Sequence, residues 1–218
     1  MSTSSNEQAD SGVPAPGTGS TTGAVPGFEL SLPGGGVFRV VPPEVGVPVI
    51  RLWLEHEWPM SIQQGLELRD RLGWQSSPTR ETMFTTGHDL GGKDASFFTL
   101  KGQIGAFRMG LASRIPKASA PPEASVLVRQ AYDQYIRVLT DLYGTGTTKH
   151  FQGRNGPQES TTWTLPTGAS LTVGVLGRII DATVDSPAAN RAAEAERRYL
   201  AEEAEFPTEP PPRTRTNK

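Results

Sequence analysis

The amino-acid sequence predicts an α+β domain in which a long helix packs on one face of an antiparallel sheet. Apolar residues recur at three- and four-residue steps from Pro122 to Tyr143, the spacing of an amphipathic helix. On both sides of this stretch, apolar and polar residues alternate with the period of two that is typical of strands. Short turn-forming stretches join these runs, as they do in antiparallel sheets. The expected order is helix, three strands, helix, two strands, helix, after an N-terminal β-hairpin.

The hairpin is predicted from two alternating segments, 28–32 and 37–41, which flank Pro33 and three glycines. The apolar run 47–54 is interpreted as one further strand, whose start Pro48 restricts to a sheet edge or a strand end. The first helix is predicted over 61–72. Its start has Ser61 as N-cap with Gln64 three residues later, and Gly73 ends it.

Three strands follow, at 81–86, 96–100 and 103–111. The first two are separated by a Gly-rich loop, 87–94, and the last two by a tight turn at Lys101 and Gly102. The long helix then begins at Pro121 and Pro122, since the first turn of a helix needs no N–H partner. Gly144 supplies a C-terminal stop.

The second half of the chain is interpreted as a polar connection, two strands and a helix. The connection covers 144–157, and the strands are predicted at 160–165 and from 169 onward. Gly174 and Gly177 are interpreted as a bulge or bend within the second strand, which continues through 179–180. Ser186 and Pro187 begin a last helix with a thin apolar face, which is expected on the surface.

Composition divides the 218-residue chain into one domain and two tails. Residues 1–26 are nearly all small, polar or proline, and 207–218 combine prolines with basic residues. Such segments bury too little apolar surface to fold, so both are expected to be disordered. Residues 27–206 fit a single domain.

Several classes of function are disfavoured by composition. The net charge is −2 and the basic residues are scattered, which argues against a nucleic-acid partner. The chain has no cysteine, which excludes disulfides and thiolate chemistry. We find neither a signal-peptide pattern nor an apolar run that could span a membrane, and expect a cytoplasmic protein.

No motif for catalysis, cofactor binding or metal ligation stands out. The histidines, His56, His88 and His150, have no metal-ligand spacing. His88 and Asp89 with Asp94 could hold a cation, but a polar hairpin loop is the simpler interpretation. Glu55 and Glu57 would share one face of a strand with His56 opposite them, which does not favour acid–base chemistry.

Four residues are candidates for binding a partner: Phe97, Phe98, Arg108 and Trp163. Phe97 and Phe98 are adjacent, so on a regular strand one of them leaves the face that the helix covers. That aromatic is either covered by the N-terminal hairpin or exposed as a contact for a partner. Trp163 allows the same two interpretations. Arg108 is expected opposite Phe107, on the face away from the long helix.

The runs 72–74, 86–97 and 162–168, together with the long helix, resemble a family of small uncharacterised actinobacterial proteins that is known only as a domain of unknown function. The resemblance covers about residues 60–200. The order of helices and strands is also similar to that of the secretion-chaperone-like fold, which serves chaperones and toxin-neutralising immunity proteins. This similarity implies a protein partner such as a toxin or a secreted effector.

Three functions remain open from the sequence. The first is a non-enzymatic module, immunity-like or chaperone-like, that binds another protein. The second is a structural or accessory subunit of a secretion or surface assembly. The third is an enzyme of unrecognised type. The oligomeric state is left open.

Overall fold

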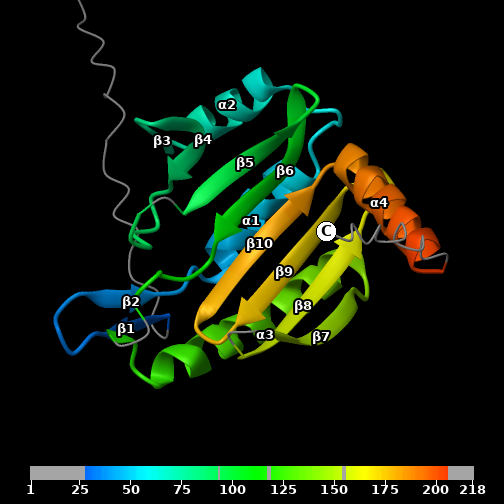
Figure 1. Ribbon diagram of the computed structural model, residues 1–218. Coiled ribbons are helices and arrows are strands. Elements are labelled where there is room, and N and C mark those ends of the chain that lie inside the picture. The colour runs from blue at the N-terminus through cyan, green and yellow to red at the C-terminus, as the bar shows by residue number, and fades with distance from the viewer. Residues whose placement is uncertain (1–27, 93, 117–118, 154–155, 206–218) are drawn as a thin grey trace, which may run out of the picture.

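The computed structural model describes residues 28–92, 94–116, 119–153 and 156–205 (Figure 1). The predicted tails, 1–26 and 207–218, lie outside the described residues. Within the described residues, eight strands form one antiparallel sheet in the order β3-β4-β5-β6-β10-β9-β8-β7. Strands β1 and β2 form a separate hairpin. Four helices complete the α+β architecture that the sequence predicts, although the order of the elements differs in detail.

The N-terminal segment forms a hairpin followed by a helix. Strands β1 (Glu29–Ser31) and β2 (Val37–Arg39) confirm the predicted hairpin. The strand predicted at 47–54 is wrong, because these residues belong to helix α1 (Pro43–Leu54). The buried positions of α1 recur at three- and four-residue steps: Pro43, Gly46, Val47, Ile50, Trp53 and Leu54. Burial of this face offsets the backbone hydrogen bond that Pro48 cannot donate within the helix.

Helix α2 (Ile62–Arg71) begins as the sequence predicts. The Ser61 hydroxyl accepts from the Gln64 backbone N–H at 3.2 Å, and the Ser61 N–H donates to Gln64 Oε1 at 2.8 Å, which completes a capping box. Gly73 follows the helix with a φ of 70°, a conformation that favours glycine. Gly65 lets α2 approach the sheet closely, since a Cβ there would lie 2.1 Å from Ile104 Cδ1.

The first strands of the large sheet are β3 (Gln75–Ser77), β4 (Arg80–Thr85), β5 (Ala95–Leu100) and β6 (Gln103–Gly110). The last three confirm the predicted strands, whereas the short polar β3 was not predicted. Lys101 and Gly102 form the tight turn between β5 and β6, with φ values of 51° and 79°. These strands form a meander in which each pairs with its sequence neighbour.

Helix α3 (Glu123–Tyr143) is the predicted long helix, and Gly144 ends it with a φ of 78°. Its buried stripe faces the sheet and α1: Ala124, Leu127, Val128, Ala131, Tyr132, Tyr135 and Leu139. The Tyr135 hydroxyl donates to the Val41 carbonyl at 3.0 Å. Gly46 provides the room for this ring, because a Cβ at that position would lie 2.0 Å from the Tyr135 hydroxyl oxygen.

The second half of the sheet contains four strands where the sequence predicted two. They are β7 (Thr147–Gly153), β8 (Gly156–Thr164), β9 (Ser170–Leu176) and β10 (Ile179–Asp185). The polar connection predicted at 144–157 is therefore wrong, since Thr147–Gly153 form β7 and β8 already begins at Gly156. The predicted bend at Gly177 is instead a hairpin turn, with a φ of 57°, that pairs Leu176 with Ile179.

Helix α4 (Pro187–Glu205) begins where predicted, and the Ser186 hydroxyl accepts from the Ala189 N–H at 3.1 Å. From Arg191 to Glu203 its side chains are exposed, as expected from its thin apolar face. Among the helices of the described segments, none combines the length and apolar character needed to cross a bilayer.

Helices α1 and α3 lie on the same face of the sheet, behind it in Figure 1. The Trp53 ring of α1 stacks on Phe107 of β6, with ring centres 4.1 Å apart and planes 2° from parallel. Strand β10 pairs with both β6 and β9, and so joins the meander β3–β6 to the meander β7–β10. The segment 28–54 thus adds to the helix-covered face and leaves the other face of the sheet free of it.

Candidate functional site

The face of the sheet turned away from α1 and α3 is called here the open face, and it is turned toward the viewer in Figure 1. Its side chains alternate along each strand with core residues such as Phe107, Val173 and Ala182. Asn190 of α4 covers one end, where its side-chain oxygen accepts from the Ser170 hydroxyl at 3.1 Å. Ten side chains of the open face take part in the features that follow from the strand register: Ser96, Phe98, Arg108, Phe151, Thr162, Thr172, Leu176, Ile179, Asp181 and Thr183.

The middle of the open face is polar. The strand register aligns five side chains across five strands: Ser96, Arg108, Thr183, Thr172 and Thr162. The Thr162 and Thr172 hydroxyls lie 2.9 Å apart and share a hydrogen bond. Arg108 forms an ion pair with Asp181, and its side chain is 46% exposed. The Asp181 side chain is 19% exposed. A pair with so exposed a guanidinium adds little stability, so Arg108 remains available for new contacts.

Apolar side chains lie on both sides of this polar band. Phe98 on β5 is 58% exposed. It pairs with Ala106 and is therefore a diagonal neighbour of Arg108 on β6. Beyond the polar band, Phe151 and Ile179 are 49% and 38% exposed, and the register places them in one row with Leu176. The open face thus combines exposed aromatic rings with a charged donor.

The four residues selected from the sequence separate into two pairs. Phe98 and Arg108 lie together on the open face. Phe97 is 1% exposed, with its ring centre 5.4 Å from that of Phe84. Trp163 is 3% exposed, and its Nε1 donates to the Gly144 carbonyl at 2.9 Å. Phe97 and Trp163 are therefore core residues that present no surface to a partner.

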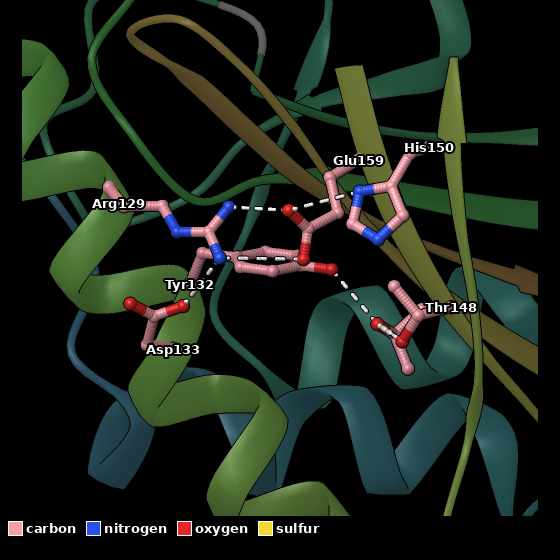
Figure 2. Close-up of polar contacts among 7 residues, drawn as sticks. Arg129, Tyr132, Asp133, Thr148, His150 and Glu159 are labelled. Atoms are coloured by element: carbon pink, nitrogen blue, oxygen red, sulfur yellow. Dashed lines mark hydrogen bonds and ion pairs between the residues drawn. The ribbon is translucent and has the colours of Figure 1, made fainter. Parts of the chain in front are cut away.

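A second polar cluster joins α3 to β7 and β8 on the helix-covered face (Figure 2). Arg129 donates to the two Glu159 oxygens at 2.6 and 3.4 Å and lies 3.1 Å from Asp133. His150 Nδ1 is 3.6 Å from Glu159. Sequence reasoning missed this cluster, because its residues come from three separate elements and share no motif.

Hydroxyl groups continue the cluster toward the core. The Tyr132 hydroxyl lies 2.9 Å from that of Thr161, which lies 2.8 Å from that of Thr148 (Figure 2). The hydrogen bond to Glu159 raises the pKa of the Arg129 guanidinium, and burial raises the pKa of the Tyr132 phenol. Both shifts hold the groups in their ordinary protonation states, which suits a cluster that attaches α3 to the sheet.

A cavity of about 460 Å³ opens beside this cluster, and its walls include Arg129, His150 and Glu159. Within this cavity, the Glu159 carboxylate accepts hydrogen bonds from Arg129.

The acidic residues that follow α1 line another cavity, of about 550 Å³, with His56 and Trp58 among its walls. The strand geometry expected for Glu55 and Glu57 is wrong, because α1 ends at Leu54 and Glu55 is its C-cap. Glu55 accepts from Arg51 at 2.9 Å and from the Tyr143 hydroxyl at 2.7 Å. The hydrogen bond from Arg51 lowers the pKa of Glu55, which keeps that carboxylate ionised.

The carboxylates of the loop between β4 and β5 do not lie together. Asp94 is buried and accepts from the Thr86 N–H and hydroxyl at 2.7 and 2.6 Å. Asp89 instead lies 3.3 Å from Arg39. Burial lowers the pKa of His88, the remaining member of the predicted cation site. Across the described residues, no group of three or more potential ligands is placed to hold a metal ion.

Elemental analysis of the purified protein is expected to find no stoichiometric transition metal. The chain has no cysteine, and its three histidines lie on separate segments, so the soft ligands of such metals do not converge. Inductively coupled plasma mass spectrometry after dialysis against buffer measures this directly. A retained ion at one equivalent per chain would reverse our interpretation of the His88 loop.

Comparison with known proteins identifies one similarity. Residues 44–186 match DUF6301, which is described as a family of unknown function. No curated protein and no solved structure matches the chain.

Proposed function

The chain belongs to DUF6301, a family of unknown function, and we propose from its own residues that it is a non-enzymatic module that binds a partner protein on the open face. The mode of action we propose is immunity-like or chaperone-like, with a toxin or a secreted effector as the partner. The main support is the exposed Phe98 beside Arg108 on a sheet face that no described helix crosses beyond the first turn of α4.

The types of side chain support this proposal. Aromatic and arginine side chains supply most of the strong anchors of protein interfaces. Phe98 is 58% exposed, which is unusual for an aromatic ring in a strand, and Arg108 needs only to exchange Asp181 for a partner's carboxylate. The threonine band between the two apolar regions offers hydroxyl donors and acceptors without long flexible side chains, so little side-chain entropy is lost on binding.

The proposal predicts that a partner is captured by the wild-type protein and lost from variants of the open face. We expect Phe98→Asp and Arg108→Glu to reduce capture at least tenfold, which corresponds to about 1.4 kcal/mol. Tagged protein is expressed in the native host, and the co-purifying proteins are quantified by mass spectrometry. The supporting result is one stoichiometric partner that both variants lose.

Arg137→Glu is the matched control. It makes the same charge reversal at an exposed position on α3, away from the open face. Thermal melts of every variant show whether the fold is intact. The proposal fails if folded Phe98→Asp and Arg108→Glu proteins retain the partner as well as Arg137→Glu, or if no stoichiometric partner is captured by the wild type.

A further inference from the structure

We propose that the edge strand β7 is the interface of a symmetric dimer, in which β7 of one copy pairs antiparallel with β7 of a second copy. This inference goes beyond binding at the open face. It concerns the edge of the sheet, separated by three strands from the strand that carries Arg108, and Phe151 of β7 is the residue that the two surfaces share. It rests on a contrast between the two edges of the eight-stranded sheet, which are β3 and β7.

The β3 edge is protected in the ways that natural sheets use to avoid edge-to-edge pairing. It is only three residues long, and its register with β4 shifts between Ser76 and Ser77. Ser77 is buried, and Arg69 of α2 donates to the Ser76 hydroxyl. A second strand would therefore find few regular backbone groups at this edge.

The β7 edge is longer and more regular than the β3 edge, and Lys149 is its one lysine. Its seven residues pair with β8 in unbroken register, from Thr147 opposite Thr162 to Gly153 opposite Gly156. The strand contains no proline, and the side chains of residues 147–152 are all exposed. In an antiparallel ladder every second residue directs its N–H and C=O away from the neighbouring strand. These groups form a regular template, and the ligand that matches such a template is another extended strand.

A second copy of the chain is the occupant that this edge fits. Every copy of the chain has the same unpaired β7 edge. A two-fold axis brings two such edges together, and each contact between them then occurs twice. When two identical antiparallel strands pair about an axis perpendicular to the sheet, one residue lies opposite its own copy. Full overlap of Thr147–Gly153 requires that residue to be the midpoint, His150.

The resulting register brings compatible side chains together. Lys149 lies opposite Phe151 of the second copy, so its alkyl chain and ammonium group meet an aromatic ring and not another lysine. Thr148 lies opposite Gln152, a pair that can share hydrogen bonds. The two His150 side chains are adjacent to one another, and each has the Glu159 carboxylate of its own chain 3.6 Å away. This register therefore places no lysine opposite a lysine and no glutamate opposite a glutamate.

Cysteine cross-linking tests both the interface and its register, because the chain has no cysteine of its own. Residues directly opposite in an antiparallel ladder have Cα atoms about 4.5–5.5 Å apart, which suits a disulfide. His150→Cys is therefore expected to form a disulfide-linked dimer on mild oxidation. Lys149→Cys alone is not, because its copy is displaced by two residues and lies more than about 7 Å away. A mixture of Lys149→Cys and Phe151→Cys proteins is expected to cross-link.

Thr85→Cys is the matched control for random collision, since it is exposed on β4, far from β7 in the sheet. Non-reducing electrophoresis separates the products. If His150→Cys cross-links no faster than Thr85→Cys, the proposed interface is wrong. If Lys149→Cys alone cross-links as well as His150→Cys, the proposed register is wrong.

Light scattering of the untreated protein supplies the second measurement. The expected mass is twice the chain mass of 23.4 kDa. His150→Asp places two carboxylates opposite one another beside the two Glu159 groups, and is expected to weaken the dimer about tenfold or more. Circular dichroism checks that the variant is folded. A wild-type protein that remains monomeric at its highest soluble concentration, or a His150→Asp dimer of unchanged affinity, would overturn the proposal.

This test is independent of the open-face proposal. Phe98 and Arg108 lie on β5 and β6, and three strands separate β6 from β7 in the sheet. If the protein is monomeric and still captures its partner, only the dimer proposal is ruled out. If the protein is a dimer and captures no partner, only the open-face proposal is ruled out.

Discussion

Replacing Trp53 with alanine is expected to lower the free energy of unfolding by about 3–5 kcal/mol, the range for truncating a large buried aromatic side chain. Trp53 is fully buried, and its ring stacks on Phe107 at 4.1 Å. It is also the largest side chain that α1 contributes to the core, so its loss opens a cavity between the helix and the sheet. Urea denaturation followed by circular dichroism measures the change.

Trp53→Phe is the informative comparison. The Trp53 Nε1 is buried and has no hydrogen-bond partner among the described residues. Replacement by phenylalanine keeps a stacked ring and removes an unsatisfied donor, whose burial costs about 1–3 kcal/mol. We therefore expect Trp53→Phe to cost less than half as much as Trp53→Ala. Equal costs for the two variants would show that the stacking on Phe107 contributes no stability.

Replacing Leu139 with alanine is expected to cost about 2–5 kcal/mol, the range for a buried leucine. Leu139 is fully buried in the stripe of α3 that faces the sheet. Arg137 lies two residues away on the exposed side of the same helix, and Arg137→Ala is expected to cost under about half a kcal/mol, as for ordinary surface changes. Chemical denaturation of both variants under identical conditions gives the difference.

The comparison of Leu139 with Arg137 tests the orientation of α3 directly. Both changes shorten a side chain in the same helix to alanine, so helix propensity differs little between them. A similar loss of stability for the two variants would mean that the stripe of α3 does not face the core.

The long helix and the regular strands could be predicted because their apolar residues follow one period over many positions. Residues 47–54 could not be assigned in this way, since Val47, Ile50, Trp53 and Leu54 lie within a short run that is apolar at most positions. Such a run fits a buried strand and a buried helix equally well. Tertiary packing decides between them, because the helix places Trp53 on Phe107 and Gly46 against Tyr135.

Strand β7 escaped prediction for the opposite reason. Residues 147–152 are exposed on both faces of the strand, so no apolar alternation marks it in the sequence. It is recognisable only by its pairing with β8, which is information that a single segment does not carry. An edge strand that is exposed to solvent on both faces therefore cannot be predicted from the spacing of apolar residues. Such a strand can nevertheless determine how two chains assemble.

Part of the candidate site followed from alternation alone. The adjacent Phe97 and Phe98 had to lie on opposite faces, and Arg108 had to lie opposite Phe107. Which face was covered could not be derived, because that depends on where α1 packs. The Arg129–Glu159 cluster was also out of reach, since its members are 30 residues apart and meet only through the packing of α3 on the sheet.

The central pairing of β6 with β10 has a consequence for how the chain reaches its folded state. Each meander is built from contacts between sequence neighbours, and its hairpins can close quickly. The contact between Arg108 and Asp181 spans 73 residues, and closing a loop of that length costs roughly 4 kcal/mol of chain entropy. We therefore expect the two meanders to form first and their union to limit the folding rate. Until then, β6 and β10 are unpaired edges rich in apolar residues, so the newly made chain is most prone to aggregation in this interval.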